Sequence, residues 1–208
     1  MMDEKVMFKL SYGLFVLTAR HKEKDNGCII NTGIQVTVEP NRVVFAVNHS
    51  NYTQEMLQDS DQFALSVLSQ EAAFSLFLQF GFQSGRDVDK FAEFSDFDRA
   101  ENGVAYITKG TNAYIAGEIE QRIDLGSHTL FIGKVTDGQV LSDAASATYE
   151  YYHAAIKPKP ERSKEKKEGK TVWRCKICGF EYEGEELPED YICPICKHPA
   201  SDFEKVII

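Results

Sequence analysis

The sequence predicts a mainly β protein: a β-barrel with peripheral helices, followed by a small metal-binding domain. Strand-like runs dominate residues 1–156, where only two stretches carry a helical pattern. Many strands with few helices favour a barrel over other architectures. Four of the five cysteines lie within 22 residues near the C-terminus, and this clustering predicts a separate metal-binding domain there.

The expected barrel strands are rich in β-branched and aromatic residues and are separated by Gly, Asn, Asp and Pro. Side chains of this kind suit a pleated, half-buried surface. The runs with this character are Leu14–Ala19, Arg42–Val47, Phe63–Val67, Ala113–Ile123 and Leu130–Val135.

The two expected helices are Asn51–Gln58 and Gln70–Phe80. The first follows Ser50 and Asn51, either of which suits the N-cap position. The second places Ala73, Phe74, Phe77 and Leu78 on one face, which predicts packing against the barrel.

A charged segment, residues 157–170, separates the two domains. It carries seven basic and three acidic side chains and no large apolar residue. Its two prolines disfavour a helix at its start, and the remainder cannot bury enough surface to fold alone. We therefore expect domains at 1–156 and 171–208 with a flexible linker at 157–170.

The composition also excludes some partners. The net charge is −9, whereas nucleic-acid binding requires a positive face that displaces counterions. No run approaches the ~18 apolar residues that span a bilayer. Residues 1–9 carry acidic side chains and lack the apolar segment of a secretory signal. We therefore expect a cytoplasmic protein without nucleic-acid or membrane partners.

Two Cys-x-x-Cys pairs, Cys175/Cys178 and Cys193/Cys196, form the strongest motif. Without a secretion signal, such clustering indicates metal binding rather than disulfides. Each pair forms a tight loop with two thiolates, and two facing loops supply four soft ligands in a tetrahedron. Both Zn²⁺ and iron suit this ligand set, so a zinc ribbon stands beside an iron centre as the alternative.

The surroundings of these cysteines resemble the rubredoxin family. The matching residues are Trp173, Cys178-Gly179, Tyr182, the Tyr191–Cys196 turn and Asp202-Phe203. The chain departs from the family in its loop of 14 residues between the pairs and in Lys197, where the family usually has glycine. The resemblance implies one Fe(Cys)₄ centre, with zinc less favoured. Such a centre has no open coordination position, so it passes single electrons and binds no substrate.

Three polar blocks mark residues 1–156. The first holds short polar side chains that supply both hydrogen-bond donors and acceptors, although a plain strand–turn–strand would look similar. Its candidate residues are Asn31, Thr32, Gln35, Val36 and Thr37. The second lies at a helix start, where free N–H groups bind phosphate, although ordinary capping explains it equally well. Its candidates are Ser50, Asn51 and Thr53.

The third block follows the second expected helix and reads Ser-Gly-x-x-x-x-Lys-Phe. Its hydroxyl and cationic side chains suit a phosphate, while a solvated charged loop is the alternative. The candidate residues are Ser84, Gly85, Arg86 and Lys90.

Together the blocks resemble the flavin reductase-like family of FMN-binding split barrels. The resemblance implies that the flavin ring contacts residues 31–37 and that the FMN phosphate binds the second and third blocks. It places His128 near the flavin and the nicotinamide, as the candidate catalytic residue. Tyr152 is a candidate flavin contact, with a subunit interface or the core as alternatives, and Cys28 is expected to be a buried apolar residue. No Gly-x-Gly-x-x-Gly follows a strand, so NADH or NADPH would bind without a Rossmann unit.

A flavin accepts a hydride and releases electrons singly, and an Fe(Cys)₄ centre accepts one electron at a time. The two resemblances therefore imply an electron-transfer oxidoreductase that passes electrons from NAD(P)H through FMN and iron to a protein acceptor. They imply a flavodiiron acceptor that reduces nitric oxide or dioxygen, and a homodimer by analogy. A free-flavin or ferric reductase with an accessory rubredoxin or zinc-ribbon module is the alternative.

Overall fold

The computed structural model describes residues 6, 9–158, 171–176, 180–193 and 198–207. The chain forms two compact units, Met1–Ile156 and Lys157–Ile208. Residues 159–170, most of the predicted linker, lie outside the described residues. Both units are built mainly from strands, so the predicted fold class is confirmed.

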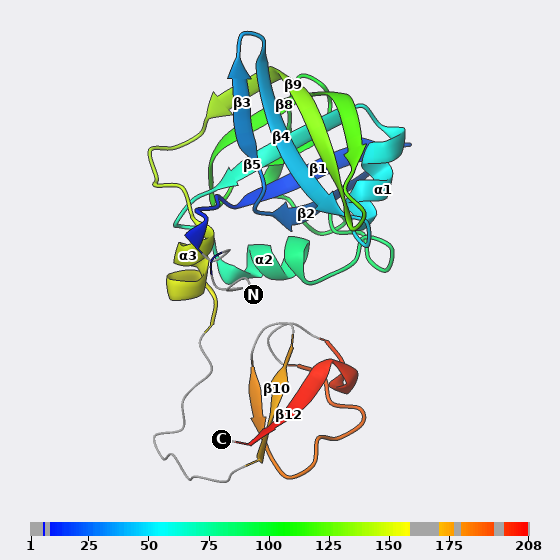
Figure 1. Cartoon of the computed structure of the whole chain (residues 1–208), viewed down its shortest axis with the longest axis vertical. Helices are drawn as coiled ribbons and strands as arrows, with labels where there is room; N and C mark the ends of the chain where they lie inside the picture. The colour runs from blue at the N-terminus through cyan, green and yellow to red at the C-terminus, as the bar shows by residue number, and fades with distance from the viewer. Residues whose placement is uncertain (1–5, 7–8, 159–170, 177–179, 194–197, 208) are drawn as a thin grey trace. The chain divides into compact units, whose positions relative to one another are not determined.

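Seven strands of the first unit form one antiparallel sheet in the order β2-β1-β5-β8-β9-β4-β3. The sheet curls into a barrel, as Figure 1 shows. Its edge strands, β2 and β3, are not hydrogen-bonded to each other within the described residues. The strands are β1 (Phe15–His21), β2 (Lys24–Ile30), β3 (Ile34–Val38), β4 (Asn41–Asn48), β5 (Gln62–Leu68), β8 (Thr111–Asp124) and β9 (His128–Val140).

The remaining elements of this unit lie outside the main sheet. They are α1 (Tyr52–Asp59), α2 (Phe74–Gly81), the hairpin β6 (Phe97–Arg99) and β7 (Ala105–Ile107), α3 (Tyr149–Tyr151) and the π-helix Tyr152–Ile156. Among the described residues, no helix has the length and apolar character that crossing a bilayer requires.

All five predicted strands and both predicted helices are present. The helix α2 begins at Phe74 rather than Gln70, because Ala73 has extended backbone and takes the N-cap position. The prediction missed the edge strand β2, whose first residues, Lys24–Gly27, favour turns over strands. It also missed the other edge strand, β3.

Phenylalanines fill the barrel interior. Phe45 packs against Phe63 and Phe131 with ring centroids 5.0 and 5.4 Å apart, and all three rings are fully buried. Burying a side chain of this size contributes about 1.5–3 kcal/mol, so this cluster is a main source of barrel stability.

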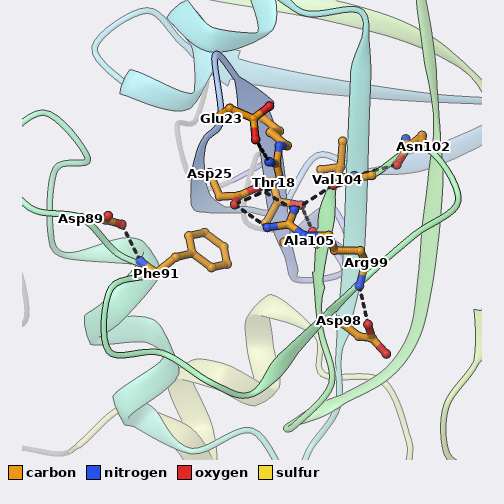
Figure 2. A network of polar contacts seen from close by, with 12 residues as sticks. Thr18, Glu23, Asp25, Asp89, Phe91, Asp98, Arg99, Asn102, Val104 and Ala105 are labelled. Carbon is orange, nitrogen blue, oxygen red and sulfur yellow. Dashed lines mark hydrogen bonds and ion pairs between the residues drawn. The ribbon is translucent and has the colours of Figure 1, made fainter.

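Hydrogen bonds between Arg99 and Asp25 connect the edge strand β2 to the β6–β7 hairpin, as Figure 2 shows. The Arg99 guanidinium donates to both carboxylate oxygens of Asp25, at 3.1 and 2.8 Å. The Arg99 side chain also donates to Gly103 O at 2.8 Å, within its own hairpin. Because successive side chains of a strand point to opposite faces, fixing Asp25 turns Lys24 and Asn26 to the other face of β2.

The second unit contains a three-stranded sheet in the order β11-β10-β12. Its elements are β10 (Thr171–Cys175), β11 (Glu181–Glu183), the short 3₁₀-helix Ala200–Asp202 and β12 (Phe203–Ile207). Tyr191 contacts Tyr182 and Phe203 with ring centroids 4.7 and 5.5 Å apart. These three rings belong to the aromatic set that the sequence marks beside the cysteines.

Candidate flavin and metal sites

One face of β2 packs against the helix α1. The Asn26 amide donates from Nδ2 to the Thr53 hydroxyl at 2.9 Å, and the Lys24 ammonium lies 4.8 Å from the centroid of the Tyr52 ring. The thiol of Cys28, two residues further along the same face, is hydrogen-bonded to Thr53. Alternation along the strand thus brings Lys24, Asn26 and Cys28 to the start of α1.

The loop that follows α2 joins this cluster through its main chain. Lys24 Nζ donates to Gly85 O at 3.0 Å. A Cβ atom at Gly85 would lie 2.2 Å from Asn26 Oδ1, which is closer than any real contact, so only glycine fits there. Asn26 is 1% exposed, and its Oδ1 has no hydrogen-bond partner within the described residues.

Arg86 attaches the same loop to the N-terminus of α1. Its guanidinium donates to Ser50 O at 2.8 Å, pairs with Glu55 and lies 5.6 Å from the Tyr52 ring centroid. The Ser84 hydroxyl accepts from the Arg86 amide at 3.2 Å. The structure therefore brings the predicted residues Ser50, Ser84, Gly85 and Arg86 to one place, beside the N-cap residue Asn51.

Neither predicted capping residue caps α1 with its side chain. Asn51 occupies the N-cap position without a side-chain cap bond. The Ser50 hydroxyl instead donates to Asn48 Oδ1 at 2.9 Å. The helix start therefore keeps main-chain N–H groups that no capping side chain satisfies, and such groups attract anions.

Two predicted phosphate ligands, Thr53 and Lys90, bond groups inside the protein, and their contact with a phosphate stays a prediction. Thr53 is fully buried, and its hydroxyl accepts from Asn26. Lys90 is 2% exposed, and its ammonium donates to Gly27 O at 2.8 Å and to Phe80 O at 3.3 Å. Burial lowers the pKa of Lys90, with the nearby Cys28 thiol opposing the shift. Lys90 thus ties the end of α2 to β2 from the inside, rather than facing a surface ligand.

The predicted ring-binding block is spread along β3 and the turn before it. Asn31 is half-buried in that turn, before β3 begins. The Thr32 hydroxyl bonds the main chain of Ala46, donating to its oxygen at 2.9 Å and accepting from its amide at 3.0 Å. Gln35 donates to Asn41 Oδ1 at 2.9 Å, and the Thr37 hydroxyl donates to Pro40 O. Val36 is 48% exposed.

The remaining two predicted contacts differ in accessibility. His128 begins β9, is half-buried and shares a hydrogen bond of 2.9 Å between its Nδ1 and the Ser127 hydroxyl. Tyr152 is 8% exposed and packs on Phe77 with ring centroids 4.5 Å apart. Tyr152 therefore packs in the core, one of the alternatives that the sequence leaves open, and its contact with the flavin stays a prediction.

Sequence reasoning missed Lys24 and Tyr52. No local pattern marks Lys24, because its main-chain partner Gly85 lies 61 residues away. A lysine next to turn-forming residues is typical of any solvated hairpin, so only the folded chain distinguishes it.

Cys28 is buried, as expected. Burial raises the pKa of the Cys28 thiol from 9.0 to about 11, although the Thr53 hydrogen bond and the charge of Lys90 both oppose the rise. A thiol with a raised pKa is a poor nucleophile at neutral pH, because the thiolate is the reactive form.

This raised pKa predicts a pH dependence of stability. The unfolded chain loses the Cys28 proton near pH 9 and the folded chain near pH 11. The stabilisation is therefore complete below pH 9 and is lost as the pH rises through about 11, by about 2–3 kcal/mol in all. Denaturant unfolding between pH 8 and 10.5 should show a smaller loss for Cys28→Ala than for the parent. Parallel pH profiles would contradict this.

The two described cysteines of the tetrad occupy equivalent positions in the second unit. Cys175 and Cys193 are 1% and 0% exposed. The Cys175 amide donates to Phe180 O and the Cys193 amide to His198 O, each at 2.8 Å and each five residues ahead. The two described cysteines therefore make the same main-chain contact, each to the carbonyl five residues ahead. Cys178, Cys196 and the predicted departure at Lys197 lie outside the described residues.

The comparisons with known proteins agree with both units. Residues 7–159 match the model of the flavin reductase like domain. The chain belongs to the flavin reductase-like family. Residues 173–204 match the rubredoxin-like domain of rubrerythrin. The chain is therefore an oxidoreductase of this family with a rubredoxin-like domain at its C-terminus.

Two relatives and one solved structure add detail. The chain is 35% identical to the high molecular weight rubredoxin of Moorella thermoacetica, over 99% of this chain and 100% of that protein. It is 33% identical to the ferric-chelate reductase (NAD(P)H) of Archaeoglobus fulgidus, over 78% of this chain and 95% of that protein. The Streptomyces globisporus NADH:FAD oxidoreductase SgcE6 superposes with a TM-score of 0.62 at 22% identity, covering 69% of this chain and 84% of that one, which supports the fold alone.

Proposed function

We propose that this chain takes hydride from NAD(P)H onto FMN and passes single electrons through an Fe(Cys)₄ centre to a protein acceptor. The observation that carries the proposal is the fusion itself. A flavin reductase-like domain at 7–159 and a rubredoxin-like domain at 173–204 share one chain. A flavin can release electrons one at a time, and an Fe(Cys)₄ centre accepts them one at a time.

The first unit fits a bound flavin phosphate. Ser50, Ser84 and Arg86 meet beside the start of α1, where main-chain N–H groups and the helix dipole favour an anion. Gly85 lets the loop approach closely, because a larger residue would collide with Asn26. FMN supplies the chemistry of accepting a hydride and releasing electrons one at a time. The polar groups of 31–37 would orient its ring.

His128 is the proposed catalytic residue. Its Nδ1 is tied to the Ser127 hydroxyl, which fixes the orientation of the imidazole ring. An oriented, half-buried imidazole suits positioning of the nicotinamide or exchange of a proton beside the flavin.

The proposed iron ligands are Cys175, Cys178, Cys193 and Cys196. Four thiolates in two equivalent loops form a closed tetrahedral set, so the metal would bind no substrate. We favour iron over zinc because the aromatic surroundings of these cysteines resemble those of rubredoxins. The electron acceptor that this resemblance implies is a cytoplasmic flavodiiron protein that reduces nitric oxide or dioxygen.

The chain is also proposed to form a homodimer. The edge strand β3 exposes Ile34, Val36 and Val38, which are 61%, 48% and 78% accessible. Apolar side chains on an unpaired edge are normally covered, and a second copy of the chain would cover them.

A second candidate function is a free-flavin or ferric reductase in which the C-terminal module is accessory. The identity to a protein named ferric-chelate reductase, over 95% of that protein, favours it. Rates with a purified flavodiiron protein, compared with rates for free Fe(III) or FMN, separate the two candidates. Faster reduction of free Fe(III) would favour the second.

Cofactor content tests the proposal directly. Protein produced anaerobically with iron and flavin available should contain one FMN and one iron per chain. Its visible spectrum should bleach on addition of NADH or NADPH, because both centres become reduced. Metal analysis and flavin extraction measure the contents. Stoichiometric zinc under iron-replete conditions would contradict the iron centre, and absence of flavin would contradict the whole scheme.

A further inference from the structure

We infer that Lys24 binds the phosphate monoester of FMN and makes the site selective for FMN over riboflavin. The inference rests on the proposed function and adds a residue that the sequence motifs do not mark.

Lys24 is a cation with unused donors at the edge of the cluster. Its half-buried ammonium donates to Gly85 O at 3.0 Å and lies over the Tyr52 ring. No carboxylate of the described residues pairs with it. An ammonium has three N–H donors, so two remain for a ligand.

The neighbouring cationic side chains already form hydrogen bonds or ion pairs within the protein. Arg86 pairs with Glu55 and bonds Ser50 O. Lys90 is buried against two carbonyl oxygens. Arg99 is held by Asp25 on the other face of β2. Of these groups, Lys24 is therefore the one whose charge is best placed to meet a new anion.

A second observation points to a ligand at the same place. Asn26, which shares the face of β2 with Lys24, is 1% exposed and has an amide oxygen without a donor in the described part of the chain. Buried acceptors without partners are rare in folded proteins. This oxygen lies under Gly85, so a hydroxyl of the FMN ribityl chain would satisfy it once the loop 84–86 moves to admit the ligand.

The charge of the ligand explains the selectivity. A phosphate monoester carries about −1.5 to −2 charges at neutral pH, whereas riboflavin carries none. A charge-assisted hydrogen bond from Lys24 therefore stabilises FMN and contributes nothing to riboflavin. Since the Lys24 side chain lies at the phosphate end, removing its charge leaves the ring contacts unchanged.

The test is a fluorescence titration of the flavin-free full chain with FMN and with riboflavin. Lys24→Met should weaken FMN binding about tenfold to a hundredfold and leave riboflavin binding unchanged. Lys24→Arg should restore most of the FMN affinity. The matched control is Lys109→Met, whose lysine is 79% exposed and lies 3.7 Å from Asp96; this variant should bind both flavins like the parent.

Riboflavin binding also reports whether Lys24→Met is folded, so a folding defect cannot imitate the expected result. Unchanged FMN affinity, or an equal loss for both flavins, would overturn the role of Lys24 while leaving the proposed function intact. A parent protein that binds neither flavin would overturn the proposed function and this inference together.

Discussion

Replacing Cys193 by serine is expected to abolish electron delivery to a protein acceptor while NAD(P)H oxidation with an artificial acceptor continues. Cys193 is fully buried, and its amide donates to His198 O. Serine replaces a soft anionic ligand by a hard neutral one, so the site should lose its metal or hold it poorly. Hydride transfer needs only the first unit, which has its own core and should keep its activity.

Three measurements check this expectation. NAD(P)H consumption is followed with an artificial acceptor and, separately, with a flavodiiron protein, alongside metal content. Ser201→Ala, at an exposed position of the same unit, is the control and should match the parent in all three. If Cys193→Ser supported the second reaction at the parent rate, the rubredoxin-like domain would not be the electron exit and the relay would be wrong.

Replacing Gly85 by alanine should disrupt the flavin site of the first unit. The added Cβ would lie 2.2, 2.6 and 2.8 Å from three atoms of the Asn26 amide. Asn26 cannot move away without breaking its hydrogen bond to Thr53, so the loop that carries Ser84 and Arg86 must shift. Overpacking of this kind costs about 1–3 kcal/mol of folding stability, and misplaced phosphate ligands should weaken FMN binding about tenfold or more.

A second substitution at Asn26 should relieve the collision that Gly85→Ala creates. All three colliding atoms belong to the Asn26 side chain, so Asn26→Ala removes them. The double variant should regain part of the stability and FMN affinity that Gly85→Ala loses, with a coupling energy of about 0.5–3 kcal/mol. Denaturant unfolding and FMN titration of both single variants and the double variant measure it. Strictly additive losses would show that the collision is not what damages the site.

The central strands were predictable because their composition is set by burial. Strands β1, β4, β5, β8 and β9 contribute the apolar side chains that fill the barrel, so β-branched and aromatic residues recur along them. The edge strand β2 escaped prediction because Lys24–Gly27 is polar and contains glycine. Those polar residues are required at the site, where β2 meets α1 and the loop after α2.

The phosphate ligands were only partly predictable, because a motif names residues but does not say which way they point. The Ser-Gly-x-x-x-x-Lys element marked the loop at Ser84–Arg86, which the structure brings to the start of α1. Its lysine, Lys90, turns inward to two carbonyl oxygens, and Thr53 turns inward to Asn26. Tyr152 likewise packs on Phe77 in the core. Side-chain direction at the end of a loop depends on packing partners that are distant in sequence.

By itself, the sequence determined the fold class, the two domains and the cysteine tetrad, because these depend on periodicity, composition and local spacing. Tertiary structure decided which cations keep unused donors and which bond carbonyl oxygens inside the protein. The sequence motif marks Lys90 and not Lys24, yet Lys24 keeps donors that face no carbonyl, whereas the Lys90 ammonium donates to two buried carbonyl oxygens. The reason is physical: a buried ammonium must bond main-chain oxygens, and only the folded chain brings those oxygens within reach.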